Sequence, residues 1–460
     1  MNTAMSRRPL SAAIVVLLAI LCGAFMLPAQ SAAQRVVMMG GEDEPRITKE
    51  QRSQAVDSIN AALLEIYVFP DVAQEMTKLL RKNLKDGKYD DLDRVGAFSE
   101  RLTEDLRSIS HDLHLSVQPR QLDPEPQDPA DTLTDEQRLQ RRLNQARRDN
   151  FSFRKVERLT GNIGYLKLNG FADAAYGGPT AIAAMNFLGY CDALIIDLRE
   201  NGGGSPSMIQ LISSYLFQEP VHLNSFYVRQ EDSIHQFWSQ AYVPGPRLTD
   251  VPVWVLTSKY TFSAAEEFSY NLRNLERATL VGDTTGGGAH PVNRVAWDGL
   301  PLGMSLPFGR AINPITGTNW EGVGVAPHIV VPSEEAYDVA LMDALETLAE
   351  KKTDPQEVYA LHWALDGLKA ERNKLELDVD DLGQYTGTFG PRRFWIEDGI
   401  LLYQREGRDP YPMFPMGDDL FGLKGLAYFR VQFERDDNGR VVSLTGKYDN
   451  GHTDHNEKTE

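Results

Sequence analysis

The sequence is poor in cysteine. It contains two among 460 residues, Cys22 and Cys191. Because Cys22 lies in an apolar N-terminal segment that we expect to be removed, the mature chain keeps only Cys191, and an intramolecular disulfide is excluded. Also absent are the motifs GxxxxGK[ST], HExxH and CxxC. The sequence therefore gives no support for nucleotide-dependent or zinc chemistry, and no cofactor or metal is expected.

Basic residues are outnumbered. The chain has 47 Lys and Arg against 65 Asp and Glu, a formal net charge of −18. A chain with this charge repels nucleic acid and anionic lipid, so neither is expected as a partner. Hydrophobic residues make up 42%, which is typical of a globular protein. The length exceeds what one compact core accommodates, so two or three domains are expected.

Long apolar stretches are missing beyond residue 27. Before that point, Arg7 and Arg8 precede the apolar stretch Ser11–Leu27, and the small residues of Ala29–Ala33 follow. This order is typical of a signal peptide. We expect residues 1–33 to be cleaved, the protein to be exported to the periplasm or outside the cell, and the mature chain to have no membrane span. An uncleaved membrane anchor is the alternative that the length allows.

The first part of the mature chain has a helical pattern. We expect an N-terminal helical domain over residues 34–117, because apolar residues recur at helical spacing in Glu50–Tyr67, Asp71–Leu84 and Phe98–Ile109. Residues 118–150 hold several prolines, many charges and few apolar side chains, which is typical of a polar linker or surface excursion.

Residues 151–352 change character and predict an α/β catalytic core with at least partly parallel strands. The strands and helices expected there are Ile163–Leu168, Ala181–Leu188, Ala193–Asp197, Ser205–Leu216, Val251–Leu256, Ala264–Leu275, Thr279–Val281, Ile329–Val331 and 337–351. A helical connector, 353–377, leads to a small C-terminal antiparallel β domain, 378–460, either a sandwich or a barrel. The last residues, 450–460, are expected to be frayed.

Ser263 is the candidate nucleophile. It lies between an apolar strand and the helix expected from Ala264. A serine at such a turn has an exposed hydroxyl beside free backbone N–H groups, which can receive an anion. The alternative is that Ser263 is an N-cap, with Glu266 completing a capping box.

A glycine-rich loop, Asp197–Ser205, follows another buried strand. Its three consecutive glycines let the backbone approach a ligand closely, and their N–H groups can form an anion nest or an oxyanion hole. Arg199 and Asn201 are candidates for substrate binding. A phosphate site, a tight turn and a structural Asp197–Arg199 ion pair are the alternatives.

Three histidines are candidates for the general base, because histidine titrates near neutral pH. His111 and His114 stand close together, and if residues 113–117 are extended, His114 and Ser116 share one face. A metal site at His111 and His114 has less support, since no further ligand cluster is visible. His290, in a second glycine-rich loop, is a reserve base or a loop-lining residue.

Glu321 is the candidate acid. It stands among small and apolar residues and could orient and stabilise the base, as the acid of a catalytic triad does. The alternative is an exposed carboxylate in a turn.

Four segments, in this order, resemble peptidase family S41, the C-terminal processing protease superfamily. The resemblance covers about residues 48–350 and is closer to the branch with interphotoreceptor retinoid-binding protein and the tricorn protease core. The segments are Asp112–His114, Asp197–Gly204, Thr261–Glu266 and Glu321–Pro327.

The resemblance implies a fold related to the crotonase/ClpP type and attack by Ser263. The oxyanion donors would be the N–H of Ala264 and that of Gly203 or Gly204. Processing proteases use a lysine base, but Gly288 stands where that lysine would be. A tricorn-like arrangement fits instead, with His114 as base and Glu321 as its partner.

The resulting prediction is an exported serine endopeptidase that cleaves protein or peptide substrates through an acyl-enzyme. Residues 118–150 are too few and too polar for the PDZ domain of the processing proteases. A non-catalytic protein that binds an apolar ligand or peptide in the same cleft is one alternative. An esterase or amidase that does not cleave peptides is another.

Overall fold

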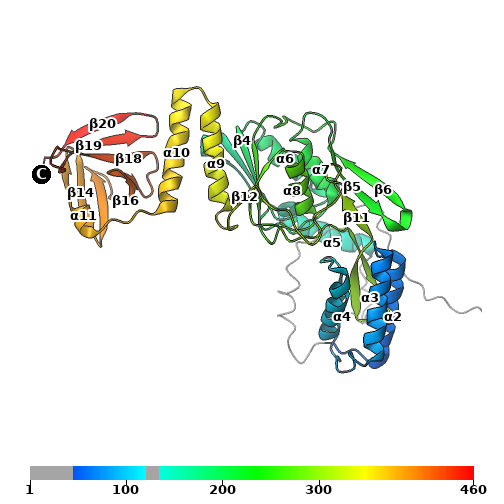
Figure 1. Cartoon of the computed structure of the whole chain (residues 1–460). Helices are drawn as coiled ribbons and strands as arrows, with labels where there is room; N and C mark the ends of the chain where they lie inside the picture. Colours follow the sequence, from blue (N-terminus) through cyan, green and yellow to red (C-terminus); the bar gives the residue numbers. More distant parts are fainter. Residues whose placement is uncertain (1–44, 121–133, 460) are drawn as a thin grey trace, which may run out of the picture. The chain divides into compact units, whose positions relative to one another are not determined.

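The computed structural model describes residues 45–120 and 134–459 (Figure 1). The predicted signal peptide, 1–33, lies outside these residues, as does part of the predicted linker. The chain divides into two compact units, and each unit is made of three separate segments of the sequence. Unit 1 comprises Met1–Val156, Leu166–Tyr190 and Ile196–Ser333, and unit 2 comprises Glu157–Tyr165, Cys191–Ile195 and Glu334–Glu460. Within the described ranges, no helix combines the length and the apolar character needed to cross a bilayer.

The described part of unit 1 begins with three helices, as the apolar spacing predicts. They are α2 (Lys49–Ile66), α3 (Pro70–Lys85) and α4 (Val95–Ser110). The Thr48 hydroxyl and the Gln51 side chain form a capping box at the start of α2. Pro70 occupies the first turn of α3, where its missing N–H costs nothing. His111, in the left-handed conformation, ends α4.

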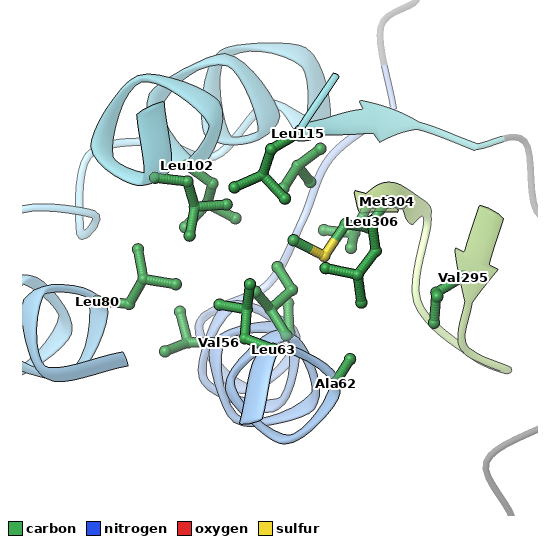
Figure 2. Packing of buried hydrophobic residues seen from close by; sticks show 14 of the residues in the cluster. Val56, Ala62, Leu63, Leu80, Leu102, Leu115, Val295, Met304 and Leu306 are labelled. Carbon is green, nitrogen blue, oxygen red and sulfur yellow. The ribbon is translucent and has the colours of Figure 1, made fainter. Parts of the chain in front are cut away.

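These helices share their hydrophobic core with strands from much later in the chain. The antiparallel sheet β1-β10-β9 consists of β1 (Ser116–Pro119), β10 (Leu302–Pro307) and β9 (Val292–Ala296). Figure 2 shows Met304, Leu306 and Val295 packed with Leu63 of α2 and Leu102 of α4. The helical segment therefore buries its apolar face partly against residues 292–307.

A six-stranded sheet carries the candidate site. Its order is β12-β8-β7-β4-β3-β2. Strand β8 runs parallel to both β12 and β7. Strands β4 and β7 are buried along their whole length, which explains why they read as continuous apolar runs. The elements are β2 (Phe153–Leu159), β3 (Ile163–Leu168), α6 (Ala174–Phe187), β4 (Ala193–Asp197), α7 (Pro206–Ser214), β7 (Val253–Thr257), α8 (Ala264–Asn274), β8 (Thr279–Gly282) and β12 (Ile329–Val330).

Several elements of unit 1 were not expected. A third sheet, β11-β5-β6, is formed by β5 (His222–Val228), β6 (Ser233–Trp238) and β11 (Gly309–Ile312). Helix α5 (Asp135–Arg148) lies inside the predicted polar linker. It begins at Thr134, whose hydroxyl forms a capping box with Gln137. Its side chains are mostly exposed, so it lacked the apolar stripe by which helices are recognised.

Unit 2 contains α9 (Ala336–Lys351), α10 (Pro355–Asn373), α11 (Val379–Gly383) and an eight-stranded antiparallel sheet in chain order. The main chain of Thr459 donates to Thr388 (2.8 Å), and Phe389 bridges Lys458, so the sheet closes into a barrel. The strands are β13 (Gly387–Phe389), β14 (Arg392–Glu397), β15 (Ile400–Arg405), β16 (Tyr411–Gly417), β17 (Leu420–Leu423), β18 (Phe429–Arg435), β19 (Val441–Tyr448) and β20 (Thr453–Glu457).

The barrel interior is filled by aromatic side chains around Phe433, as expected for a barrel of eight strands. The prediction that residues 450–460 are frayed is wrong for β20. This strand pairs with β19, from Thr453 opposite Lys447 to Glu457 opposite Ser443. The predicted fold class is confirmed: an α/β core, N-terminal helices and a C-terminal antiparallel β domain. The predicted domain boundaries stay predictions.

Candidate active site

Ser263 lies on a constrained turn between β7 and α8. Its backbone has φ 54° and ψ −121°, an unusual conformation for a residue with a side chain. The turn is attached to the glycine-rich loop after β4: Thr261 donates its hydroxyl hydrogen to Leu198 O (2.9 Å), and Phe262 N–H donates to Asn201 O (3.1 Å). Backbone strain of this kind clusters at functional sites.

The glycine-rich loop faces the turn at Gly203. A Cβ at this position would lie 2.8 Å from Ser263 Cβ and 3.1 Å from Ala264 N, and the φ of 108° also favours glycine. The Gly203 N–H donates to Asn201 Oδ1 (2.9 Å), which turns it toward that side chain. Of the three predicted oxyanion donors, Ala264 and Gly204 therefore keep the N–H groups better suited to the role. Ala264 is the first residue of α8, where N–H groups have no partner within the helix.

The two residues predicted to bind substrate support the loop itself. Asn201 is fully buried, and its amide also donates to Leu168 O (3.0 Å). Arg199 forms an ion pair with Asp197 (2.7 Å) and donates to Ser333 O (2.8 Å). This is the structural ion pair that the sequence left open, and it fixes the shape of the loop.

Glu266 ties the nucleophile turn to the second glycine-rich loop. Its carboxylate is buried and accepts hydrogen bonds from Ser263 N (2.9 Å), Thr285 Oγ1 (2.5 Å), Gly287 N (2.6 Å) and Gly288 N (2.8 Å). Burial raises the pKa of Glu266 to about 6, and the four donors oppose that rise. Sequence reasoning gave Glu266 only a capping role, because the contacts with residues 285–288 depend on the tertiary fold.

His114 packs against the turn that carries the nucleophile. Its ring lies 4.7 Å, centroid to centroid, from that of Phe262, the residue before Ser263. The ring also fills the space beside Gly288, where a Cβ would lie 2.6 Å from His114 Cε1. Burial lowers the pKa of His114 to about 4, and the Asp112 charge opposes this in part. The imidazole is therefore neutral at neutral pH and can accept a proton.

His114 does not lie on an extended strand, as the sequence suggested for residues 113–117. It sits in a turn before β1, and its main-chain N–H donates to Asp112 Oδ1 (3.0 Å). Its Nδ1 atom is buried and has no hydrogen-bond partner. Among the described residues, no hydrogen bond joins the Ser263 hydroxyl to His114 or His290. The apo geometry of catalytic hydrogen bonds is often looser than that of the substrate complex.

His290 belongs to a buried group with two carboxylates. Its Nδ1 lies 2.7 Å from Asp112 Oδ2 and 3.6 Å from Glu321 Oε2. Tyr67 donates to the same Asp112 oxygen (3.3 Å). Burial opposes ionisation of Asp112, but the hydrogen bond and charge of His290 outweigh it, so the Asp112 pKa lies below its ordinary value. Burial, and then the Asp112 charge, raise the pKa of Glu321.

The Glu321 carboxylate is largely buried, whereas the alternative from the sequence was an exposed carboxylate in a turn. Its side chain is 15% exposed, and it accepts hydrogen bonds from Ala289 N (2.5 Å) and Leu113 N (3.4 Å). These two donors flank His290 and His114 in the sequence. Glu321 therefore hydrogen-bonds to the backbone next to His114, through the N–H of Leu113, and not to the His114 ring.

The remaining histidine candidate lies apart from this group. His111 is exposed and ends α4. The metal site considered at His111 and His114 gains no support from this placement. Within residues 45–120 and 134–459, potential metal-ligand atoms of Asp112, His290 and Glu321 lie within 4.8 Å of one another. The 2.7 Å separation of His290 Nδ1 and Asp112 Oδ2 is that of a hydrogen bond.

Comparison with known proteins gives two matches to sequence profiles. Peptidase family S41 matches residues 162–331, and the N-terminal domain of this peptidase family in eukaryotic IRBP matches residues 47–151. A carboxyl-terminal-processing protease from Picosynechococcus sp. is 31% identical over 176 residues, which are 37% of this chain. The match spans only 40% of that protease.

Solved structures are also similar to this chain, and two of them serve as examples. A putative peptidase from Parabacteroides merdae is 18% identical, with a TM-score of 0.45, over 66% of this chain and 97% of that one. The tricorn protease is 14% identical, with a TM-score of 0.39, over 70% of this chain and 37% of that one.

Proposed function

The chain belongs to peptidase family S41, and from this membership we propose that it is a serine endopeptidase acting through an acyl-enzyme on Ser263. Its substrates are proteins or peptides. The observation that carries the proposal is the backbone of Ser263, which is held at φ 54° against Gly203 at the N-terminus of α8. A serine that served only as a helix cap would need neither this conformation nor a glycine facing it.

His114 is the general base of the proposed reaction. It is a neutral imidazole beside the nucleophile turn, and it occupies the space that a side chain at Gly288 would need. This supports histidine in place of the lysine base of processing proteases. The base takes the Ser263 proton during attack and returns it to the leaving amine.

Glu321 completes the proposed Ser-His-Glu relay. Its carboxylate holds the N–H groups of Leu113 and Ala289, so it fixes the backbone on which His114 is presented. Its negative charge, when ionised, stabilises the imidazolium that forms during attack. Ala264 N–H, with Gly204 N–H, receives the developing oxyanion.

Labelling by a fluorophosphonate, followed by intact-mass measurement and peptide mapping, tests this function. A single adduct on Ser263 that is lost in His114→Ala supports an activated nucleophile and its base. Ser263→Ala should lower peptide hydrolysis by about 10⁴- to 10⁶-fold while leaving the circular dichroism unchanged. Full hydrolysis by purified Ser263→Ala would rule out the mechanism, and no adduct together with tight ligand binding would favour a binding protein.

We also propose that the protein is exported and cleaved near Ala33. The basic, apolar and small-residue order of residues 7–33 supports this. The N-terminal sequence of the protein recovered from the periplasm or medium is the test. Recovery of the uncleaved chain in the membrane fraction would instead support an anchor.

A further inference from the structure

We propose that His290 is a positioning residue, which holds the base His114 in place through the Asp112 carboxylate. The inference rests on the proposed function, in which His114 activates Ser263. It gives a role to a histidine that is neither nucleophile, base nor oxyanion donor in that mechanism.

One carboxylate joins the two histidines. Asp112 Oδ2 accepts a hydrogen bond from His290 Nδ1 (2.7 Å), while Oδ1 accepts one from the backbone N–H of His114 (3.0 Å). Asp112 is 1% exposed and His290 is 6% exposed, so water does not compete for either group. A hydrogen bond to a charged group in such a site is among the stronger ones. A displacement of the His290 ring therefore moves the backbone that carries His114.

The loop that carries His290 is also the loop that fixes the nucleophile. Gly287 N and Gly288 N donate to Glu266, and the same carboxylate accepts the N–H of Ser263. Two residues beyond Gly288, His290 reaches Asp112 and, through it, His114. Residues 285–290 thus connect the backbone of the nucleophile to that of the base, with one buried carboxylate at each end.

The His290 ring has little freedom to leave this arrangement. Phe69 contacts it edge-on, with ring centroids 5.5 Å apart. Glu321 Oε2 lies 3.6 Å from its Nδ1 atom. The N–H donor of His290 lies near two largely buried carboxylates, Asp112 and Glu321. Without it, their negative charges would repel each other with no positive or donor group beside them. The other titratable or charged groups that face the cluster are Tyr67, His114 and Arg107.

The test compares His290→Ala with His290→Asn, whose amide N–H can replace Nδ1–H. We expect His290→Ala to lower kcat by about 30- to 100-fold with KM changed less than about 2-fold, because a misplacement near 1 Å can cost about 100-fold. His290→Asn should recover most of this loss. Asp112→Ala should match His290→Ala, and the double variant should be no worse than either single one.

The pH dependence of Ser263 labelling separates positioning from catalysis. If His290 positions the base, the labelling rate of His290→Asn still shows a midpoint, since His114 still titrates. That midpoint moves upward, because the His290 charge no longer lowers the His114 pKa. The matched control is His111→Ala, an exposed histidine at the end of α4, which should leave kcat and the midpoint unchanged. Circular dichroism and the melting temperature show whether each variant is folded.

Three results would overturn the proposal. One is wild-type kcat in folded His290→Ala. Another is loss of labelling in both His290 variants with disappearance of the midpoint, which would make His290 the base itself. The third is additive loss in the double variant. Failure of the proposed function would look different, since wild-type Ser263 would then remain unlabelled or Ser263→Ala would stay active.

Discussion

At the scale of single residues, the site depends on positions where no side chain fits. Gly288 is one such position, because a Cβ there would lie 2.2 Å from Phe262 Cζ and 2.6 Å from His114 Cε1. Gly288→Ala must displace one of these rings. We expect kcat of Gly288→Ala to fall by about 100-fold through misplacement of His114, measured as peptide hydrolysis and as the labelling rate of Ser263.

Gly383→Ala is the control for this change, since a Cβ at Gly383 meets nothing within 4 Å. It should leave both rates unchanged. If Gly288→Ala hydrolysed peptides at the wild-type rate, the space that the structure gives to His114 would have no bearing on the reaction.

The sequence offered candidate residues for the site more readily than the contacts between them. Ser263, His114 and Glu321 stand in short motifs, so they could be named without a structure. The Asp112–His290 hydrogen bond joins residues 178 positions apart, and no local pattern encodes it. The only signal was that Asp112 opens the segment that includes His114. The burial of the Asn201 amide was not foreseen either, because it depends on what folds over the loop.

At the scale of elements, helix α8 carries a buried acid that the reaction does not use. Burial raises the pKa of Glu267 from 4.5 to about 7, and contacts with Asn224 and Asn271 oppose this in part. The folded chain thus binds this proton more tightly than the unfolded chain. The stability gained from it is present below about pH 4.5 and is lost as pH rises toward 7.

Glu267→Gln, which stays neutral at every pH, should remove this loss. Its free energy of unfolding relative to wild type should rise by up to about 3 kcal/mol between pH 4.5 and pH 8, as measured by urea unfolding. Glu219→Gln replaces an exposed carboxylate of the same unit and should show no such trend. If the free energy of unfolding of Glu267→Gln differed from that of wild type by the same amount at pH 4.5 and pH 8, the raised pKa of Glu267 would be contradicted.

Elements were predictable where burial was uniform along them. β4 and β7 are buried at every position, so their apolar runs gave their bounds to within two residues. β6 alternates between half-buried and exposed positions, and its exposed face includes Ile234 and Trp238, so its pattern was ambiguous. β20 carries polar residues along its length, and only its pairing with β19 makes it a strand.

At the scale of the whole molecule, each of the two units contains a hydrophobic cluster of its own among the described residues. Leu102 belongs to the cluster of the helices and β9–β10, and Phe433 belongs to the barrel interior. We expect Leu102→Ala and Phe433→Ala each to cost about 2–5 kcal/mol. In differential scanning calorimetry, each should lower a different transition. A single transition lowered equally by both variants would show that the two units unfold together.

The type of secondary structure in each region was predictable from the spacing of its apolar residues. Which distant regions pack against each other was not. The helices α2–α4 have clear apolar stripes, and nothing in their sequence indicates that Met304 and Leu306 cover them. The barrel was foreseen as a β domain from its short strands and Asp-Gly turns. Its closure depends on the main-chain hydrogen bond from Thr459 to Thr388 and on the bridge between Phe389 and Lys458, which side-chain patterns do not specify.

The shared core of the helices and β9–β10 has a consequence for how the chain is made. Roughly 180 residues separate the end of α4 at Ser110 from the start of β9 at Val292. At a synthesis rate of about 5–20 residues per second, the helices wait about 10–40 s for the strands that cover their apolar face. During that interval the nascent chain exposes the apolar face of these helices, and transiently exposed surface of this kind makes a chain prone to aggregate.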